Sequence, residues 1–469
     1  MTQEKEQEKE QEQGKEQVRF FSPGYVFYAA RQAVKRHASG GNVLIGATIL
    51  ALIVANIPAI SGYYLDFCTW EISLKIGSFN LFSHGGEPLN MLQFINDALM
   101  AVFFFSIGLE IKREVMVGEL SSFRKALLPI IAACGGMIVP VLIFSYLSAG
   151  TDFTHGAAIP MATDIAFSIS VLAMLGKRVP ISLKIFLTTL AVVDDIGGII
   201  VIATCYSTHI DYIPILISLG LLVLLFLGSR AKIQSKAFYF GIGIAVWYLF
   251  LNSGIHSTIA GVLVAFTIPA KPLFDPRKYV RSMRNAISQF TVDDYGALKE
   301  NVTLSTKQLD LLKQVESMSD KVISPLQDLE DTLHPVVNYF ILPLFAFANA
   351  GIFLLDMDPS TIFEGVSLAV ILGLVVGKFL GIFSFSWLAI ILRLTPKPAG
   401  STWSMIAAVS VLGGIGFTVS LFIANLSFGN NIELLNHAKL GIVVGSLLAG
   451  ILGFILLQFT MPKHKKANS

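Results

Sequence analysis

Long apolar runs recur along most of this 469-residue chain, and they restrict its fold more than any other feature. Hydrophobic residues make up 54% of the sequence and charged residues only 14%, a composition that excludes an ordinary soluble globular protein. A helix of about 20 apolar residues crosses a bilayer, and these runs lack the strict alternation of barrel strands. The sequence therefore predicts an all-α polytopic membrane protein.

Hydropathy predicts twelve transmembrane helices. The spans lie near 42–58, 91–111, 126–148, 156–176, 181–205, 211–228, 236–252, 254–270, 335–355, 364–392, 403–427 and 435–460. The seventh and eighth spans are the least clearly divided, since only Ser253 and Gly254 stand between their apolar residues.

The charges between the spans test this count independently. With a cytoplasmic amino terminus, the connections on the cytoplasmic side hold these basic positions: Lys112, Arg113, Arg124, Lys125, Lys177, Arg178, Arg230, Lys232, Lys236, the stretch 271–284, Arg393, Lys397, Lys463, Lys465 and Lys466. The opposite side holds mainly acids: Asp66, Glu71, Glu87, Asp152, Asp211, Asp356, Asp358 and Glu433. This asymmetry follows the positive-inside rule. It predicts an even number of spans and two cytoplasmic termini.

The segments outside the spans set the domain boundaries. Residues 1–18 are nearly all Glu, Gln and Lys and predict a disordered cytoplasmic tail, and 19–41 predict an interfacial segment. The first part of the membrane domain is 42–274, with spans 1–8 and an outer loop at 59–90, and the second is 334–460, with spans 9–12. A basic cytoplasmic tail occupies 461–469. We expect no removable signal peptide.

The cytoplasmic insert 275–333 separates the two parts of the membrane domain. A capping-box pattern at Ser305 to Gln308 predicts an amphipathic helix that ends at Ser324. Because the insert has too few apolar residues for a core of its own, we interpret it as a lid or regulatory element.

Other features of the composition exclude several kinds of site. The three cysteines, Cys68, Cys134 and Cys205, are too widely spaced for a CxxC metal pair or a disulfide framework, and we interpret them as packing residues. A net charge of +2 gives no indication of nucleic-acid binding. We expect no cofactor.

Four ionisable residues lie near the centre of predicted spans: Asp164 in the fourth, Asp194 and Asp195 in the fifth and Lys378 in the tenth. Asp97 joins them nearer the outer end of the second span. An ionised group at that depth costs several kcal/mol, so it is by default a candidate functional residue. The alternative is a set of buried groups held by hydrogen bonds for structure alone. Carboxylates are hard oxygen ligands suited to Na⁺, and neighbouring acids titrate jointly. We favour a cation and proton site at Asp194 and Asp195.

The division of labour between the two acids stays open at this point. Adjacent helical positions differ by about 100°, so one acid can face the ion while the other pairs with Lys378.

Two spans contain helix-breaking residues. The eleventh holds Gly413, Gly414 and Gly416, and the fourth holds Pro160 followed by Thr163 and Asp164. Paired interrupted helices in two inverted repeats mark the binding site of a secondary transporter, and spans 3–5 and 10–12 would be those repeats. Half-helix ends carry partial charge. Asp164 could offset amino ends and Lys378 carboxyl ends, either as compensation only or as part of proton coupling.

Several runs resemble the NhaA family of sodium/proton antiporters. The similar segments are 95–104, 108–114, 159–167, 344–351 and 414–418, together with the Asp194-Asp195 pair. The resemblance implies twelve helices with an inverted repeat in which spans 4 and 11 are discontinuous and cross. It also implies electrogenic exchange of internal Na⁺ or Li⁺ for external protons in the bacterial inner membrane, regulating intracellular pH and sodium.

The same resemblance implies roles for particular residues and partners. Na⁺ and protons would bind at Asp194 and Asp195, while Thr163, Asp164 and Lys378 would belong to the crossing assembly. A pH-sensing group would include Glu110, Arg113, Glu114, His256 and Glu330, with an ordinary charged interface as the alternative. The long insert departs from the family pattern and leaves the pH set-point open. The partners implied are the lipid bilayer and a second copy in a homodimer.

Other functional classes fit less well. An intramembrane aspartyl protease would need Tyr-Asp and Gly-x-Gly-Asp motifs on different helices, and neither occurs. A membrane prenyltransferase would need an acid cluster of the DDxxD type, whereas Ile196 and Gly197 follow the Asp pair. The nearest alternative is a Na⁺-coupled transporter of an organic solute with the same fold. The chain is not expected to be an enzyme.

Overall fold

The computed structural model describes residues 40–76, 79–84, 87–207, 210–272, 276–289, 306–354 and 359–461. Predictions for 1–39, which include the tail and most of the interfacial segment, and for 462–469 lie outside these residues. In the described part, the larger helices of the first half are α3 Gly40–Asn56, α4 Pro58–Thr69, α6 Met100–Met116, α7 Phe123–Leu147, α8 Ile165–Met174, α9 Ile181–Cys205, α10 Tyr212–Arg230, α11 Lys236–Leu251 and α12 Thr258–Thr267. Those of the second half are α13 Pro276–Gln289, α14 Thr306–Val322, α15 Pro325–Val336, α16 Leu342–Asn349, α17 Gly365–Leu372, α18 Lys378–Ile391, α19 Trp403–Leu412, α20 Phe417–Phe428 and α21 Ile432–Thr460.

Short helical turns complete several of these helices. They comprise α5 Met91–Phe94, the π turns η1 Ile95–Leu99, η6 Val337–Ile341 and η9 Gly373–Gly377, and the 3₁₀ turns η2 Glu119–Ser121, η3 Thr154–Met161, η4 Gly176–Arg178 and η8 Pro359–Phe363. A π turn inserts one extra residue into a helix and is frequent at functional sites. Here η1 carries Asp97, and η9 ends immediately before Lys378.

The predicted all-α polytopic fold is confirmed. Seven helices in the described residues are long and apolar enough to span a membrane, and two bent pairs raise the number to nine. Helices occupy all twelve predicted positions, but the count of twelve spans is not confirmed. Two of the other helices, α11 and α12, are apolar but short, and the ninth position is assembled from α15, η6 and α16.

The first predicted span ends in a sharp bend. The axes of α3 and α4 differ by 115°, and Pro58 stands at the first position of α4. Proline has no N–H to give to a preceding turn and is well suited to the first turn of a new helix. The chain therefore changes direction at the start of the predicted outer loop, and α4 packs against α16 through Tyr64, whose hydroxyl donates to the carbonyls of Phe347 and Ala348.

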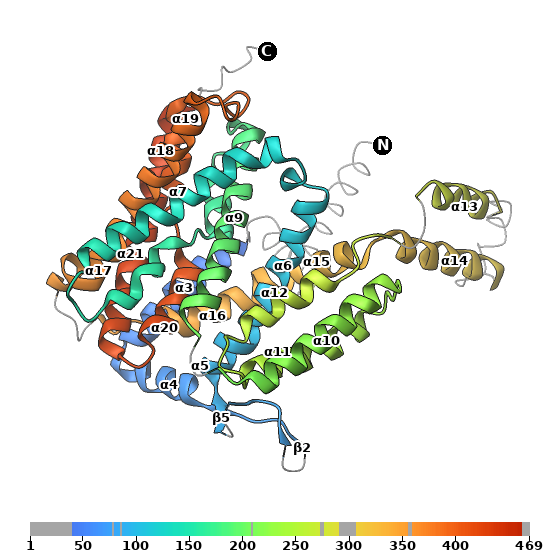
Figure 1. The fold of residues 1–469 in the computed structure, drawn as a ribbon, viewed down its shortest axis with the longest axis horizontal. Coiled ribbons are helices and arrows are strands. Elements are labelled where there is room, and N and C mark those ends of the chain that lie inside the picture. Colours follow the sequence, from blue (N-terminus) through green and yellow to red (C-terminus); the bar gives the residue numbers. More distant parts are fainter. Residues whose placement is uncertain are drawn as a thin grey trace, which may run out of the picture.

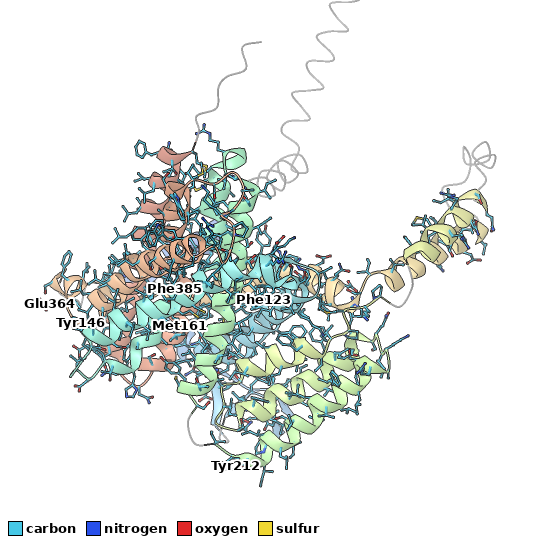
Figure 2. All side chains as sticks on the ribbon, turned by 45° about the horizontal axis from the view of Figure 1, so that its top comes forward. Phe123, Tyr146, Met161, Tyr212, Glu364 and Phe385 are labelled. Atoms are coloured by element: carbon cyan, nitrogen blue, oxygen red, sulfur yellow. The ribbon has the colours of Figure 1, made fainter. Side chains whose placement is uncertain are left out.

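The rest of the outer loop forms small antiparallel sheets. The strands β1 Glu71–Ile72, β5 Glu87–Asn90 and β4 Ser83–His84 make one sheet in that order, and β2 Lys75–Ile76 pairs with β3 Phe79–Asn80. Figure 1 shows these strands together at one end of the helical body. Tyr146 at the end of α7 and Tyr212 at the start of α10 point outward (Figure 2) and are 83% and 77% exposed. Exposed aromatics at helix ends are typical of a membrane interface.

Close helix packing holds the tenth span against the third. The Cβ that Gly381 lacks would collide with the carbonyl oxygen of Gly135, and the reverse also holds. Small residues let membrane helices approach until their backbones touch. This contact between α7 and α18 fixes the position of Lys378, which lies one turn before Gly381.

Candidate functional site

The two interrupted spans cross at their breaks. The fourth span is non-helical between η3 and α8, and the eleventh between α19 and α20. The backbone N–H of Asp164 donates to the carbonyl of Ile415 at 2.6 Å, and the Thr163 hydroxyl lies 2.8 Å from the carbonyl oxygen of Gly413. These bonds join the two breaks directly, and the helix axes on either side of the second break differ by 43°.

The glycines of the eleventh span allow this close crossing. A Cβ at Gly414 would collide with the carbonyl oxygen of Leu374, and one at Gly416 would come within 2.8 Å of the carbonyl oxygen of Ala162. Glycine lets another backbone approach where any side chain would interfere.

Asp164 caps two helices with one carboxylate. Its Oδ1 accepts from the N–H of Phe167 in the first turn of α8 at 3.0 Å. Its Oδ2 accepts from the N–H of Thr418 in the first turn of α20 at 3.1 Å and from the Thr418 hydroxyl at 2.7 Å. Both amino ends carry partial positive charge, and a capping oxygen satisfies N–H groups that have no partner inside a helix.

Lys378 lies on the other side of the crossing. Its Nζ is fully buried, 2.5 Å from Asp194 Oδ2 and 3.0 Å from Thr163 Oγ1. Thr163 Oγ1 in turn lies 2.6 Å from Asp194 Oδ2. The ammonium group therefore reaches the carboxyl end of α19 through Thr163, which also contacts the Gly413 carbonyl oxygen. Asp194, Thr163 and Lys378 form one buried polar triad.

The two adjacent acids face different surroundings. Asp194 Oδ2 lies in the triad, whereas Asp194 Oδ1 is buried with no hydrogen-bond partner among the described residues. Asp195 lines a cavity of about 300 Å³, and we call this the inner cavity. Its polar lining includes Ser106, Glu110, Thr163, Asp164, Ser170, Asp195, His334, Asn338 and Thr418. The sequence left open which acid pairs with Lys378. In the structure Asp194 makes that pair, and Asp195 lines the inner cavity.

The oxygens around the inner cavity suit a hard cation. Asp195, Asp164, Thr163 and Thr418 supply carboxylate and hydroxyl oxygens, the ligand type preferred by alkali and other hard cations. Within the described parts of the chain, no group of three or more His, Cys, Asp or Glu side chains could hold a metal ion. A transported ion would therefore depend on one or two carboxylates together with neutral oxygens.

The charged end of α6 meets α15. Arg113 lies 2.9 Å from Glu330 and 3.3 Å from Glu114, while Glu110 lines the inner cavity. Lys112 donates to the carbonyls of Phe266 and Ile268 at the end of α12. Burial raises the pKa of Glu330, and the Arg113 guanidinium opposes that shift.

His256 lies apart from that group. It lines a different cavity of about 520 Å³, which we call the outer cavity, together with Asp97, Asp152 and Asn425. Its Nε2 is 3.9 Å from Asp97 Oδ1. The structure therefore brings together Glu110, Arg113, Glu114 and Glu330 but places His256 with Asp97.

Three asparagines that meet inside the bundle had no role in the predictions from sequence. Asn349 is fully buried, and its side chain exchanges hydrogen bonds with Asn96 at 2.9 Å and accepts one from Asn425 at 2.8 Å. The available signal was an amide in the middle of an apolar span, because a buried polar group needs a partner there. Thr418 was missed in the same way, although it begins the helix after a glycine break.

A polytopic helical fold with two interrupted helices crossing beside buried acids defines a secondary transporter. The sequence profile of the family described as Na⁺/H⁺ antiporter 1 matches residues 31–457. The chain belongs to this family, which confirms the resemblance noted from its motifs.

Curated relatives share most of their length with this chain. Na⁺/H⁺ antiporter NhaA of Phocaeicola vulgatus is 53% identical, covering 93% of this chain and 97% of the relative. The protein of the same name from Bacteroides fragilis is 56% identical over 90% of this chain and 96% of its own length. Na⁺/H⁺ antiporter NhaA 2 of Syntrophotalea carbinolica is 45% identical, with 90% and 94% covered.

Because Asp164 caps both α8 and α20, its bond to Thr418 can be tested. Thr418→Val keeps the shape and the backbone N–H bond but removes the hydroxyl bond to a buried carboxylate. We expect a loss of about 1.5–3 kcal/mol in the free energy of unfolding, measured by thermal or denaturant unfolding in detergent. Thr418→Ser keeps the hydroxyl and is the matched control. Equal stability of the Val and Ser variants would contradict the assigned bond.

Proposed function

We propose that this chain is an electrogenic secondary antiporter that exports Na⁺, and also Li⁺, from the cell in exchange for protons. This activity would regulate intracellular pH and sodium. The proposal is supported chiefly by Asp195, a carboxylate that lines the inner cavity beside the buried Asp194–Lys378 pair. The relatives' name, Na⁺/H⁺ antiporter, agrees with this proposal. The chain is a transporter rather than an enzyme.

Asp195 is the proposed site for both ions. Bound Na⁺ takes a carboxylate oxygen of Asp195 and neutral oxygens from Thr163 or Thr418, and a proton on the same carboxylate displaces it. Among the described residues, none donates a hydrogen bond to the Asp195 carboxylate, which leaves its oxygens available. Competition for one carboxylate couples the two flows when the site opens to only one side at a time.

Asp194, Thr163 and Lys378 are proposed to hold that site and to take part in proton coupling. More than one titratable group at the site allows more protons to enter than Na⁺ ions leave, which makes exchange electrogenic. Asp164 holds the amino ends of α8 and α20 together. Gly413, Gly414 and Gly416 keep the break that can move during transport.

The inner and outer cavities are proposed to be the two access routes. Asn425 and Asp97 line the outer cavity. The amide of Asn425 donates to Asn349, which is also bonded to Asn96. By the positive-inside rule, the basic ends of α6 and α10 support a cytoplasmic position for the inner cavity. We expect a multi-pass protein of the bacterial inner membrane with both termini inside. A homodimer through the outer loop is expected from the family resemblance alone.

The alternative, a Na⁺-coupled carrier of an organic solute, is not favoured. The three curated relatives described above are named as Na⁺/H⁺ antiporters. A channel also fits poorly, because it needs no paired broken helices.

The different surroundings of the two acids give the first test. In proteoliposomes with an internal pH-sensitive dye, Na⁺ or Li⁺ should move protons in the wild type. Asp195→Asn should abolish this exchange because it removes the competing carboxylate. Asp195→Glu is the matched control that keeps the charge and should retain measurable exchange. Wild-type rates in Asp195→Asn would show that the site is wrongly assigned.

The buried pair can be tested in the same preparation. Lys378→Ala leaves Asp194 buried without a cation and should destabilise the fold by about 3–5 kcal/mol. Asp194→Asn combined with Lys378→Gln removes both charges and should recover much of this loss in thermal unfolding. If the double variant is no more stable than Lys378→Ala, the pair does not stabilise the crossing.

The group of Glu110, Arg113, Glu114 and Glu330 is proposed to sense pH at the inner mouth. Glu330 faces Arg113, Glu114 and Asp331, and its pKa is raised mainly by burial. His256 joins the proposal only as a separate sensor at the outer cavity.

A raised pKa sets the sign of the pH effect on stability. The folded protein holds the Glu330 proton more tightly than the unfolded chain, so this group stabilises the fold most below the ordinary Glu pKa of about 4.3. Its contribution is lost as pH rises through the raised pKa. Glu330→Gln should remove this part of the pH dependence of thermal unfolding, and Glu364→Gln at the far end of α17 should not. Parallel pH curves for wild type and Glu330→Gln would contradict the proposal.

A further inference from the structure

The α13–α14 hairpin of the cytoplasmic insert is anchored beside the inner mouth. The N–H of Leu326 donates to the carbonyl of Pro269 at 3.2 Å, so the insert leaves and returns at the end of α12. An ion pair between Lys236 and Asp328 ties α11 to α15 at the same level. Lys112 contacts the last carbonyls of α12 there. The hairpin is thus attached where the ends of α6, α11 and α12 meet α15, and α15 also lines the inner cavity through His334.

The hairpin does not cover the inner cavity. Figure 1 shows α14 running outward from α15, with α13 beside it and away from the rest of the body. No described residue of α13 or α14 lines the inner cavity. The lid interpretation of the insert therefore has no support in this arrangement, and the exposed faces of the hairpin need another partner.

One face of α13 is apolar and exposed. Val280 and Ile287 are seven residues apart, which places them on the same side of the helix, and they are 55% and 63% exposed. Tyr279 and Met283 are only partly exposed, and α14 packs against α13. Burying a side chain the size of valine or isoleucine is worth about 1.5–3 kcal/mol, so this uncovered pair favours an apolar partner.

Positive charge flanks that apolar face. The α13 sequence holds Arg277, Lys278, Arg281 and Arg284 and no acid. Arg281 and Arg284 are exposed and follow Val280 at one and four positions, which puts Arg284 within about 40° of it around the helix. By contrast, α14 balances its three lysines with three acids. The cationic character of the hairpin therefore lies on α13.

We propose that α13 lies on the inner-leaflet surface and binds anionic phospholipid headgroups. Val280 and Ile287 enter the boundary between headgroups and acyl chains, while Arg281 and Arg284 reach the phosphates. A short helix with an apolar face flanked by basic residues binds membranes in this way, and basic clusters next to a membrane span attract anionic lipid. Its 14 residues are too few to cross a bilayer. The name of the leaflet rests on the proposed orientation, whereas the contact itself does not.

This face of α13 suits a lipid surface better than nucleic acid. Nucleic acid would use the arginines but would leave Val280 and Ile287 in water. A bilayer surface satisfies both groups at once, and the anchors at Pro269 and Asp328 keep the hairpin near one. Because only Ile323 and Ser324 separate α14 from α15, docking also restrains the helix that carries Glu330.

Hydrogen–deuterium exchange of the full-length protein tests the contact. The protein is placed in nanodiscs of phosphatidylcholine alone or of phosphatidylcholine mixed with phosphatidylglycerol. We expect the α13 amides to be protected in the anionic discs, less so at high salt, and not in the zwitterionic discs. Each arginine removed should weaken docking about five-fold (about 1 kcal/mol), so Arg281→Gln with Arg284→Gln should lose most of the protection. Val280→Ser with Ile287→Ser should also reduce it.

A matched control is Lys313→Gln, which removes one exposed positive charge from α14 instead. It should leave the protection of α13 unchanged. Equal protection in both kinds of disc, or full protection in the double Arg variant, would overturn the proposal. Protection that persists in the double Ser variant, or that appears only with added RNA, would also overturn it. Na⁺-driven proton movement is measured separately in each variant, so a failure of docking is distinguishable from a failure of antiport.

Discussion

Two helix breaks meet in the apolar interior and leave backbone N–H and C=O groups without partners inside a helix. Water cannot reach them there, so other groups of the protein must form these hydrogen bonds. One carboxylate, Asp164, accepts hydrogen bonds from the amino ends of α8 and α20. Thr163 reaches the carbonyl of Gly413 and receives a hydrogen bond from Lys378. The crossing is therefore held by side chains rather than by continuous helices, and such bonds can be exchanged for others during transport.

This arrangement explains why, of the three acids at the crossing, only Asp195 has no hydrogen-bonded or ion-paired partner among the described residues. Asp164 is occupied by two helix ends and Asp194 by a buried ammonium group. Asp195 is the remaining acid and lines the inner cavity. The buried lysine has a cost of desolvation that its partner must offset. Because the charges of Asp194 and Lys378 cancel, a third charge, on Asp195 or on a cation at the proposed site, can form close by.

Hydropathy and composition were enough to predict the class of fold and the positions of the long apolar helices, because a bilayer demands long apolar segments. They did not predict α4, which lies in the expected outer loop. The buried acids, the lysine and the glycine break could also be found, since each is expensive or unusual at that depth. Which acid pairs with Lys378 was not predictable, because it depends on the rotation of α9 against α18. Predicting that His256 lies apart from Glu330 would require the path of α12 through the bundle. The bend at Pro58 depends on how α4 packs. None of these is encoded in a local pattern.

The central claim is that Na⁺ and a proton compete for Asp195. The most direct measurement is the uptake or release of protons when Na⁺ is added to the purified protein in weakly buffered detergent solution, followed by calorimetry or a pH dye. We expect proton release with Na⁺ binding at pH values where Asp195 is protonated, and neither binding nor release in Asp195→Asn. Undiminished proton release by Asp195→Asn, or Na⁺ binding with no proton released at any pH, would contradict it.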